Sequence, residues 1–373
     1  QTCIRIQGSL NIEALEQTLS YLVNRHETLR TKIIMKGEHA FQCILPSFKF
    51  ELVKKNTTEE NVYEDIKEII NIPFNLEETL FKGQLLKISN SDYVLVLTFH
   101  HMISDGWSIG VFNREFSHCY KAFAREEDPN LPELEIQYAD YSIWQREWFK
   151  EEVLQKQLEY WTHQLSDVPS IDLSFKSREE ESNYDADEYL YKIPKATLDK
   201  LKIVSHKEEV TLFMLLLAAF QGLLSKYVNQ QDIAIGTPIA NRRANETEGL
   251  IGFFVNTLVI RSSIDVNNTF RDFLQRTKQT ILSAYEHQDI PFEQLVETLN
   301  VDRDLRKHSL FQLFFVLQNN EMSDIALHNL DVSNIFYANI KKSIFDLALN
   351  IVETEEGLYV NFEYSKHLFD KKY

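Results

Sequence analysis

The sequence is organised around nine residues that separate a strand from a helix, His100-His101-Met102-Ile103-Ser104-Asp105-Gly106-Trp107-Ser108. The preceding run, 93–99, is apolar and β-branched over strand length, which predicts a buried strand. The following run, 107–123, repeats apolar residues at helical spacing. Neighbouring side chains of a strand point to opposite faces, so one histidine of the pair can face a cavity while the other packs.

The turn also allows three other interpretations. The two histidines are often simply buried and hydrogen-bonded. His100, His101 and Asp105 are metal-ligand types, but no Cys or Glu ligand follows at helical spacing, and we expect no metal site. Residues 106–110 match G-x-S-x-G, the nucleophile elbow of serine hydrolases. That elbow turns directly from strand into helix, whereas the strand here ends about nine residues before Ser108. A serine hydrolase remains an alternative.

Composition narrows the class of protein. A chain of 373 residues exceeds what one core commonly serves, so we expect two lobes. The net charge of −17 argues against nucleic acid or an anionic membrane as the main partner, although it says little about a protein partner. Cys3, Cys43 and Cys119 are too scattered for a disulfide or zinc framework, which fits a reducing cytoplasm. We find no signal peptide and no membrane-spanning stretch.

The chain alternates strands and helices in both halves, which predicts an α/β protein with two α+β sandwich lobes. The polar, acidic stretch 168–187 is the best linker, so we place the lobes at 1–175 and 176–373. We expect a strand at 48–53 and one long helix from Tyr138 to about Leu165.

Two further stretches carry polar residues of uncertain purpose. Residues 25–31 are densely charged just as a helix ends, where cations also suit the helix dipole. Asn256 interrupts the apolar stretch 251–261. A buried amide there must find hydrogen bonds, from the backbone, which is the commoner case, or from a ligand.

Taken together, these stretches resemble the condensation domain of nonribosomal peptide synthetases, in the chloramphenicol acetyltransferase-like superfamily. The turn matches the family's His-His-x-x-x-Asp-Gly, and five other motifs accompany it in the family's order: 25–31, 138–144, 251–261, 287–297 and 303–312. The resemblance implies two acetyltransferase-like lobes in a V with a central tunnel. The family's opening Ser-x-x-Gln-x-x-Leu-Trp motif and its final helix are missing, so we expect an excised fragment or omitted flanking residues.

The resemblance implies transfer of a carrier-bound aminoacyl or peptidyl thioester to the amine of a carrier-bound aminoacyl acceptor. Trp107-Ser108 after both histidines resembles peptide-bond-forming domains, because heterocyclising relatives place Asp where His100 stands and epimerising relatives differ after Asp-Gly. Residues 251–261 resemble domains that accept an L-configured donor. Two alternatives remain, a catalytically idle relative that recruits or gates a partner, and a stand-alone acyltransferase that uses coenzyme A thioesters.

Residue roles also follow from the resemblance. His101 faces the tunnel as general base or hydrogen-bonding anchor, and Gly106 lets the backbone approach the substrate. Asp105 pairs with an arginine of the early motif, which we expect to be Arg25. The catalytic group is therefore His101, His100, Asp105 and Gly106. Structural support comes from Arg25, Arg30 and Trp107, and the tunnel is lined by Ser108, Asn256 and Tyr138.

The expected partners are a donor and an acceptor carrier protein and a neighbouring adenylation domain. The domain itself is expected to bind no cofactor, because its substrates arrive on the phosphopantetheine arms of the carriers. Such carriers are usually acidic, as this chain is, so docking must rely on local basic or apolar patches. We expect a monomeric, cytoplasmic domain without nucleic-acid or membrane binding.

Overall fold

The fold is described from a computed structural model of the chain. The structure describes residues 1–149, 151–171, 173, 185–265, 267–299, 310–318, 324–335 and 343–369. The predicted lobe boundary between residues 175 and 176 lies outside these residues, as does most of the 303–312 motif.

Two compact units make up the chain. The first comprises Gln1–Glu147, Arg242–Phe254 and Asn320–Asn339, and the second comprises Trp148–Asn241, Val255–Asn319 and Ile340–Tyr373. Two segments from late in the sequence therefore complete the first unit. The consecutive ranges expected from the sequence do not include this exchange of segments.

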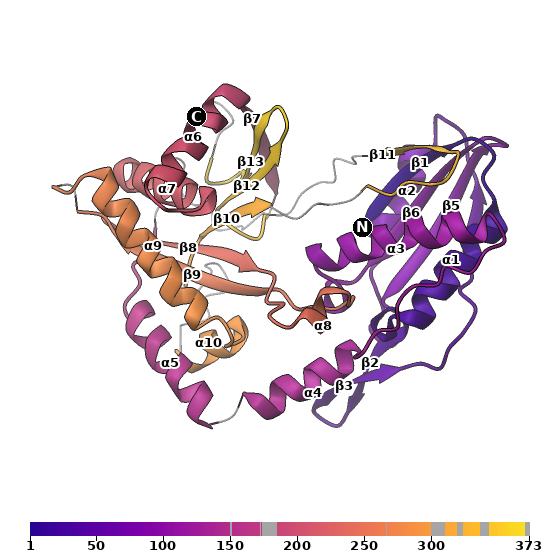
Figure 1. The fold of residues 1–373 in the computed structure, drawn as a ribbon, viewed down its shortest axis with the longest axis horizontal. Helices are drawn as coiled ribbons and strands as arrows, with labels where there is room; N and C mark the ends of the chain where they lie inside the picture. The colour runs from indigo at the N-terminus through magenta and orange to yellow at the C-terminus, as the bar shows by residue number, and fades with distance from the viewer. Residues whose placement is uncertain are drawn as a thin grey trace. The chain divides into compact units, whose positions relative to one another are not determined.

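A sheet covered on both faces forms the first unit. Its strand order is β11 (Asp331–Asn334), β1 (Thr2–Gln7), β6 (Asp92–Phe99), β5 (Phe81–Ser89) and β4 (Val53–Asn56). Figure 1 shows α1 (Ile12–Arg25) and α3 (Gly106–Phe123) together along this sheet.

The central strand β6 is buried on both faces. Leu95 and Leu97 belong to the apolar core built with α1 and α3, whereas Val94 and Val96 pack with α2 (Val62–Asn71). Successive side chains of a strand point to opposite faces, so a strand buried on both faces needs the continuous apolar run seen at 93–99.

Smaller elements surround this sheet. A separate hairpin pairs β2 (Thr31–Lys36) with β3 (His39–Ile44), and the short helices α4 (Tyr138–Trp148) and α8 (Asn245–Glu248) complete the described part of the unit. The predicted strand at 48–53 is wrong, since the strand in this region is β4. The backbone N–H groups of Phe48 and Phe50 instead donate to side chains of α1, namely Asn24 and Ser20.

The second unit has its own sheet and core. The strand order is β7 (Ala186–Pro194), β13 (Gly357–Ser365), β12 (Leu347–Thr354), β10 (Leu313–Gln318), β8 (Asp232–Ile239) and β9 (Asn256–Ser263). Strand β10 runs parallel to β12 and β8. The core draws side chains from α5 (Glu151–Leu165), α6 (Lys195–Lys207), α7 (Leu212–Val228), α9 (Phe270–Glu286) and α10 (Phe292–Thr298).

Both units combine a sheet with helices, which confirms the predicted α+β class. The predicted single helix from Tyr138 to about Leu165 is wrong, because α4 and α5 are separate helices. Each packs within its own unit: Tyr138 of α4 contacts Phe254, whereas Trp161 of α5 is buried in the second core. Among the described residues, no single helix is long and apolar enough to cross a bilayer, although the bent pair of α6 and α7 together passes the test of length and composition.

Candidate active site

The His-His-x-x-x-Asp-Gly turn follows β6 directly. The His100 backbone N–H donates to the Leu80 carbonyl at 2.9 Å, which extends the strand contact by one residue. Residues 101–103 then form a single 3₁₀ turn. Asp105 is the N-cap of α3, since its Oδ1 accepts from the Ser108 N–H at 2.8 Å. The predicted strand, turn and helix are therefore all present.

The imidazole of His101 is held in one tautomer. Its Nδ1 lies 2.7 Å from the Ser104 carbonyl oxygen, which can only accept, so Nδ1 must carry the proton. In the neutral ring this leaves Nε2 unprotonated. The side chain is exposed, and Nε2 is the atom that can take a proton from a bound substrate.

His100 has the opposite tautomer. Its Nδ1 accepts from the Met102 backbone N–H at 3.1 Å, so the proton of the neutral ring lies on Nε2. Its ring packs edge-on against Phe74, with centroids 5.6 Å apart. Burial, together with the charge of His101, lowers the pKa of His100. These contacts describe a neutral, packed histidine that shapes the turn.

Asp105 binds an arginine that none of the sequence motifs indicated. Its Oδ1 lies 3.4 Å from Nη2 of Arg242, which is 137 residues away, and the two side chains are 3% and 1% exposed. Burial lowers the pKa of Arg242, and the charge of Asp105 opposes this effect. The sequence held one indication of this pair: Arg242 follows shortly after β8, and a buried Asp such as Asp105 requires a cationic partner.

The predicted pair between Asp105 and Arg25 is wrong. Arg25 Nε instead lies 3.1 Å from Oε1 of Glu115, a residue of α3, and His26 Nε2 lies 2.7 Å from the other oxygen of the same carboxylate. The early motif therefore binds α3 at Glu115, which is ten residues after the N-cap Asp105. The reason is geometric, because Arg25 ends α1 and α1 packs alongside α3.

Ser108 is buried at the start of α3. Its Oγ lies 2.7 Å from Asp105 Oδ1 and 2.8 Å from the Gly252 carbonyl oxygen, and it accepts from Arg242 Nη2 at 2.9 Å. With an exposed fraction of 0% this hydroxyl is a structural cross-link, so the geometry does not support a serine hydrolase. Its place in a substrate tunnel stays a prediction.

The predicted support residues occupy different contacts. Trp107 Nε1 donates to the Glu248 carbonyl at 2.9 Å, which ties the turn to the 242–254 segment of the same unit. Arg30 donates to the Leu45 carbonyl and lies 3.3 Å from Glu27, so it braces the start of the β2–β3 hairpin rather than the turn.

The remaining predicted residues differ in their surroundings. The Tyr138 hydroxyl donates to the Phe253 carbonyl at 2.8 Å within the first unit. Asn256 belongs to the second unit and donates to the carbonyls of Gln288 and Ile290, while its Oδ1 accepts from the N–H groups of Thr257 and Phe292. Its amide is thus occupied by backbone, and a substrate contact stays a prediction.

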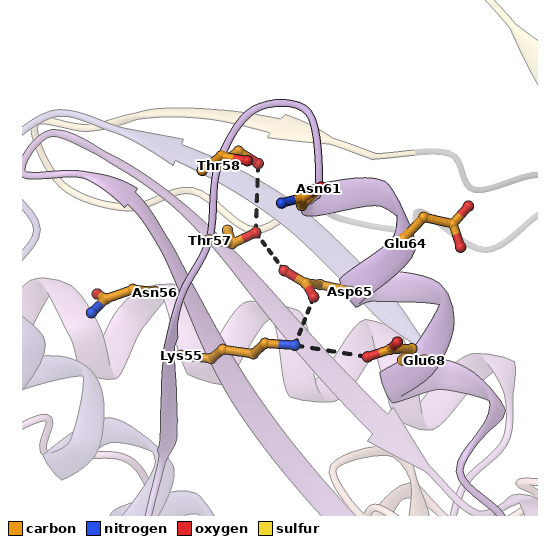
Figure 2. Close-up of a pocket in the computed structure, with 8 residues that line it drawn as sticks. All are labelled: Lys55, Asn56, Thr57, Thr58, Asn61, Glu64, Asp65 and Glu68. Carbon is orange, nitrogen blue, oxygen red and sulfur yellow. Dashed lines mark hydrogen bonds and ion pairs between the residues drawn. The ribbon is translucent and has the colours of Figure 1, made fainter.

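A polar depression elsewhere in the first unit, of about 460 Å³, lies between the end of β4 and α2 (Figure 2). Lys55 Nζ reaches Asp65 at 2.6 Å and Glu68 at 3.7 Å, and the Thr57 hydroxyl donates to Asp65. The hydrogen bonds from Lys55 and Thr57 lower the pKa of Asp65. No predicted site residue lines the depression, and Lys55, Thr57, Asp65 and Glu68 bind one another across it. In the described parts of the chain, no group of His, Cys, Asp and Glu side chains is arranged to hold a metal ion.

Comparison with known proteins identifies the family. The family model described as "Condensation domain" matches residues 1–373. The chain belongs to the condensation-domain family. A linear gramicidin synthase subunit from Brevibacillus parabrevis is 40% identical over 381 residues, which cover 99% of this chain and 8% of that protein. This condensation domain therefore spans less than a tenth of the length of that relative.

Solved structures show the same fold. The X-domain from teicoplanin biosynthesis superposes with a TM-score of 0.90 at 23% identity, over 100% of this chain and 86% of that chain. The first condensation domain of the CDA synthetase superposes with a TM-score of 0.78 at 15% identity, also over 100% and 86%. The condensation-domain fold predicted from the motifs is thus confirmed.

Proposed function

We propose that this condensation domain forms peptide bonds in a nonribosomal peptide synthetase. It transfers an aminoacyl or peptidyl group from one carrier-protein thioester to the amine of a second carrier-bound amino acid. The observation that carries the proposal is the tautomer of His101, whose Nδ1–H is bound by Ser104 so that Nε2 is available to the reaction.

The reaction needs positioning and the handling of one proton. A thioester is already activated, and an α-amino group with a pKa near 7.7–8.0 is neutral for roughly a tenth of the time at pH 7. As the C–N bond forms, the nitrogen becomes acidic and gives its proton to Nε2 of His101. The C–S bond then breaks, and protonated His101 returns the proton to the departing thiolate. General base catalysis contributes roughly 10²–10⁴-fold, and alignment of the two reactants can contribute more.

Gly106 supplies the second element of the mechanism. It is the first residue of α3, and the first N–H groups of a helix have no partner within the helix. A Cβ added there would meet no protein atom within 4 Å, so the backbone at this point is open to an approaching carbonyl. We assign the stabilisation of the developing oxyanion to this helix start.

The partners follow from the same proposal. Donor and acceptor carrier proteins present the substrates on phosphopantetheine arms, and an adenylation domain is the expected neighbour, so the domain requires no cofactor of its own. The match to this chain covers 8% of the gramicidin synthase subunit, and the remaining length of that relative supports an assembly of many domains. The resemblance of 251–261 to other domains of the family supports an L-configured donor residue.

One alternative has an observation in its favour. The fold of this chain superposes with a TM-score of 0.90 on the X-domain from teicoplanin biosynthesis, which is not named a condensation domain. A domain that recruits or gates a partner would have this fold as well. The presence of both histidines, with Nε2 of His101 left available, favours catalysis.

Intact-mass detection of dipeptide formation between two aminoacyl-loaded carrier proteins tests the proposal. We expect transfer by the wild type and a loss of about 10²–10⁴-fold in His101→Ala, with His118→Ala, an exposed histidine of α3, as the matched control. A partial loss in His101→Ala favours positioning over proton transfer. No transfer with any loaded pair from a folded protein would support the recruiting alternative, and transfer from free coenzyme A thioesters alone would support the stand-alone acyltransferase. Donors loaded with L- or D-residues test the stereochemistry.

A further inference from the structure

The segment 252–254 is fixed through its backbone rather than through its side chains. The Gly252 carbonyl oxygen accepts from Ser108 Oγ at 2.8 Å, and the Gly252 N–H donates to the same Oγ at 3.1 Å. The Phe253 carbonyl oxygen accepts from the Tyr138 hydroxyl at 2.8 Å, and the Phe254 N–H donates to Asp105 Oδ2 at 3.0 Å. Residues 105 and 108 belong to the candidate site itself, so the segment and the histidine turn share one rigid frame.

This frame directs one side chain at His101. The ring of Phe253 contacts the His101 imidazole edge-on, with centroids 5.1 Å apart and ring planes at 87°. His101 is exposed, and its single described hydrogen bond, from Nδ1 to Ser104, permits the ring to pivot about that bond. An aromatic ring placed edge-on restricts this pivot and is a favoured arrangement.

The frame around Phe253 is also closely packed. The ring of Tyr138 contacts Phe254 with centroids 5.1 Å apart, and a Cβ built on Gly252 would lie 2.3 Å from Tyr138. The Arg242 guanidinium lies 4.0 Å from the centre of the Phe254 ring. The neighbours of Phe253 therefore have little freedom to move, and neither does its backbone.

We propose that Phe253 is a positioning residue that holds the His101 imidazole at the angle required for proton transfer, and that Tyr138 holds Phe253. The inference rests on the proposed role of His101 as proton acceptor. No proton passes to Phe253 or Tyr138; both act through His101.

Kinetics of dipeptide formation with Phe253→Leu test the inference. Leucine keeps an apolar side chain but removes the ring, so we expect kcat to fall about 2- to 10-fold while KM for both loaded carriers is unchanged. Phe253→Tyr restores the ring and should recover most of kcat. Tyr138→Phe, which removes the hydroxyl that holds the Phe253 carbonyl, should lower kcat over a similar range. Phe41→Leu on the β2–β3 hairpin is the control for loss of an aromatic ring elsewhere.

Histidine-selective NMR separates this inference from the proposed function. The ring of Phe253 shifts the His101 resonances, and we expect these shifts to change in Phe253→Leu, return in Phe253→Tyr and stay unchanged in Phe41→Leu. These spectra require no turnover, so an inactive wild type overturns the proposed function while the contact is still tested. Wild-type kcat with unmoved His101 resonances in Phe253→Leu overturns the inference. A raised KM at constant kcat also overturns it, because that pattern indicates contact with the substrate.

Discussion

Asp105 and Arg242 form a buried ion pair. Such a pair adds little net stability, but removing one of its partners is strongly destabilising. Removing two charges from water costs several kcal/mol, which a mutual attraction at 3.4 Å repays only in part. Deleting one partner is more harmful, because the other charge then stays buried alone. In the described chain, Arg242 Nε also has no hydrogen-bond partner, so the guanidinium depends on the contacts of its other nitrogens.

We expect Asp105→Ala to lower the free energy of unfolding by about 3–5 kcal/mol and to reduce soluble yield, with a corresponding loss from Arg242→Ala. A double-mutant cycle measured by urea unfolding should show coupling between these two positions and none between Asp105 and Arg25. A soluble, fully stable Asp105→Ala protein that has lost activity would instead assign Asp105 a direct part in catalysis.

Glu115 should make stability depend on pH. Burial by itself raises the pKa of this carboxyl, but the hydrogen bond and charge of His26 and the charge of Arg25 outweigh burial, so the pKa is lowered. In the unfolded chain the pKa of a Glu side chain is near 4.3. Around this pH the folded state therefore binds fewer protons at Glu115 than the unfolded chain does. Its contribution is complete above that value and is lost as the pH falls through the lower, folded-state pKa.

Glu115→Gln should thus be less stable than the wild type by about 1.5–3 kcal/mol at neutral pH. The difference should stay constant down to about pH 4.3 and narrow as the pH falls further through the lower, folded-state pKa, since the wild-type carboxyl then becomes neutral as well. Urea midpoints at a series of pH values measure this. A difference that stays constant with pH would show that the lost stability comes from packing rather than from charge.

At the scale of elements, the turn and the 252–254 segment form one assembly. Alanine substitutions at its two glycines should have different effects on stability. Gly252→Ala places a Cβ 2.3 Å from Tyr138 and 2.8 Å from Phe254, whereas Gly106→Ala meets nothing within 4 Å.

We expect Gly252→Ala to cost about 1–3 kcal/mol of unfolding free energy and to displace Tyr138 from Phe253. Gly106→Ala should fold with wild-type stability, as alanine favours a helix, so any fall in its rate reports on substrate approach. Thermal unfolding of both variants measures the difference. Equal stability of the two would show that Tyr138 moves aside without cost.

The elements that sequence predicted correctly are those with a local pattern. The run 93–99 and the helix after it were evident because burial leaves its period in consecutive residues. The prediction of a strand at 48–53 was wrong because side chains of α1 bind the backbone N–H groups of Phe48 and Phe50, which a strand would pair with a neighbouring strand. Arg242 and Phe253 could not be assigned, since each acts on residues more than a hundred positions earlier in the chain and no local pattern records such a contact.

On the scale of the whole molecule, the first unit is discontinuous in sequence. Its sheet includes β11, which pairs with β1 from the start of the chain, and its candidate site includes Arg242 and the 252–254 segment. Ile251 is 2% exposed within the core formed by α1 and α3. A fragment that ends at Glu147 would expose this core and leave Asp105 without Arg242.

Residues 1–147 expressed alone should therefore be insoluble or lack fixed tertiary structure, although they contain every residue of the His-His-x-x-x-Asp-Gly turn. Dispersion of an NMR spectrum, compared with that of the full chain, measures this directly. A well-dispersed spectrum from the fragment would show that the later segments are dispensable for folding.

Discontinuity also has a consequence during synthesis on the ribosome. The Asp105 carboxylate is made long before Arg242, and the edge strand β11 emerges later still. At 5–20 residues per second, about 10–50 s separate the appearance of the histidine turn from that of β11. Until Arg242 has been made, the Asp105 carboxylate has no partner, and until β11 has been made, the outer edge of β1 is unpaired. We therefore expect the emerging domain to depend on chaperones until its last segments have been synthesised.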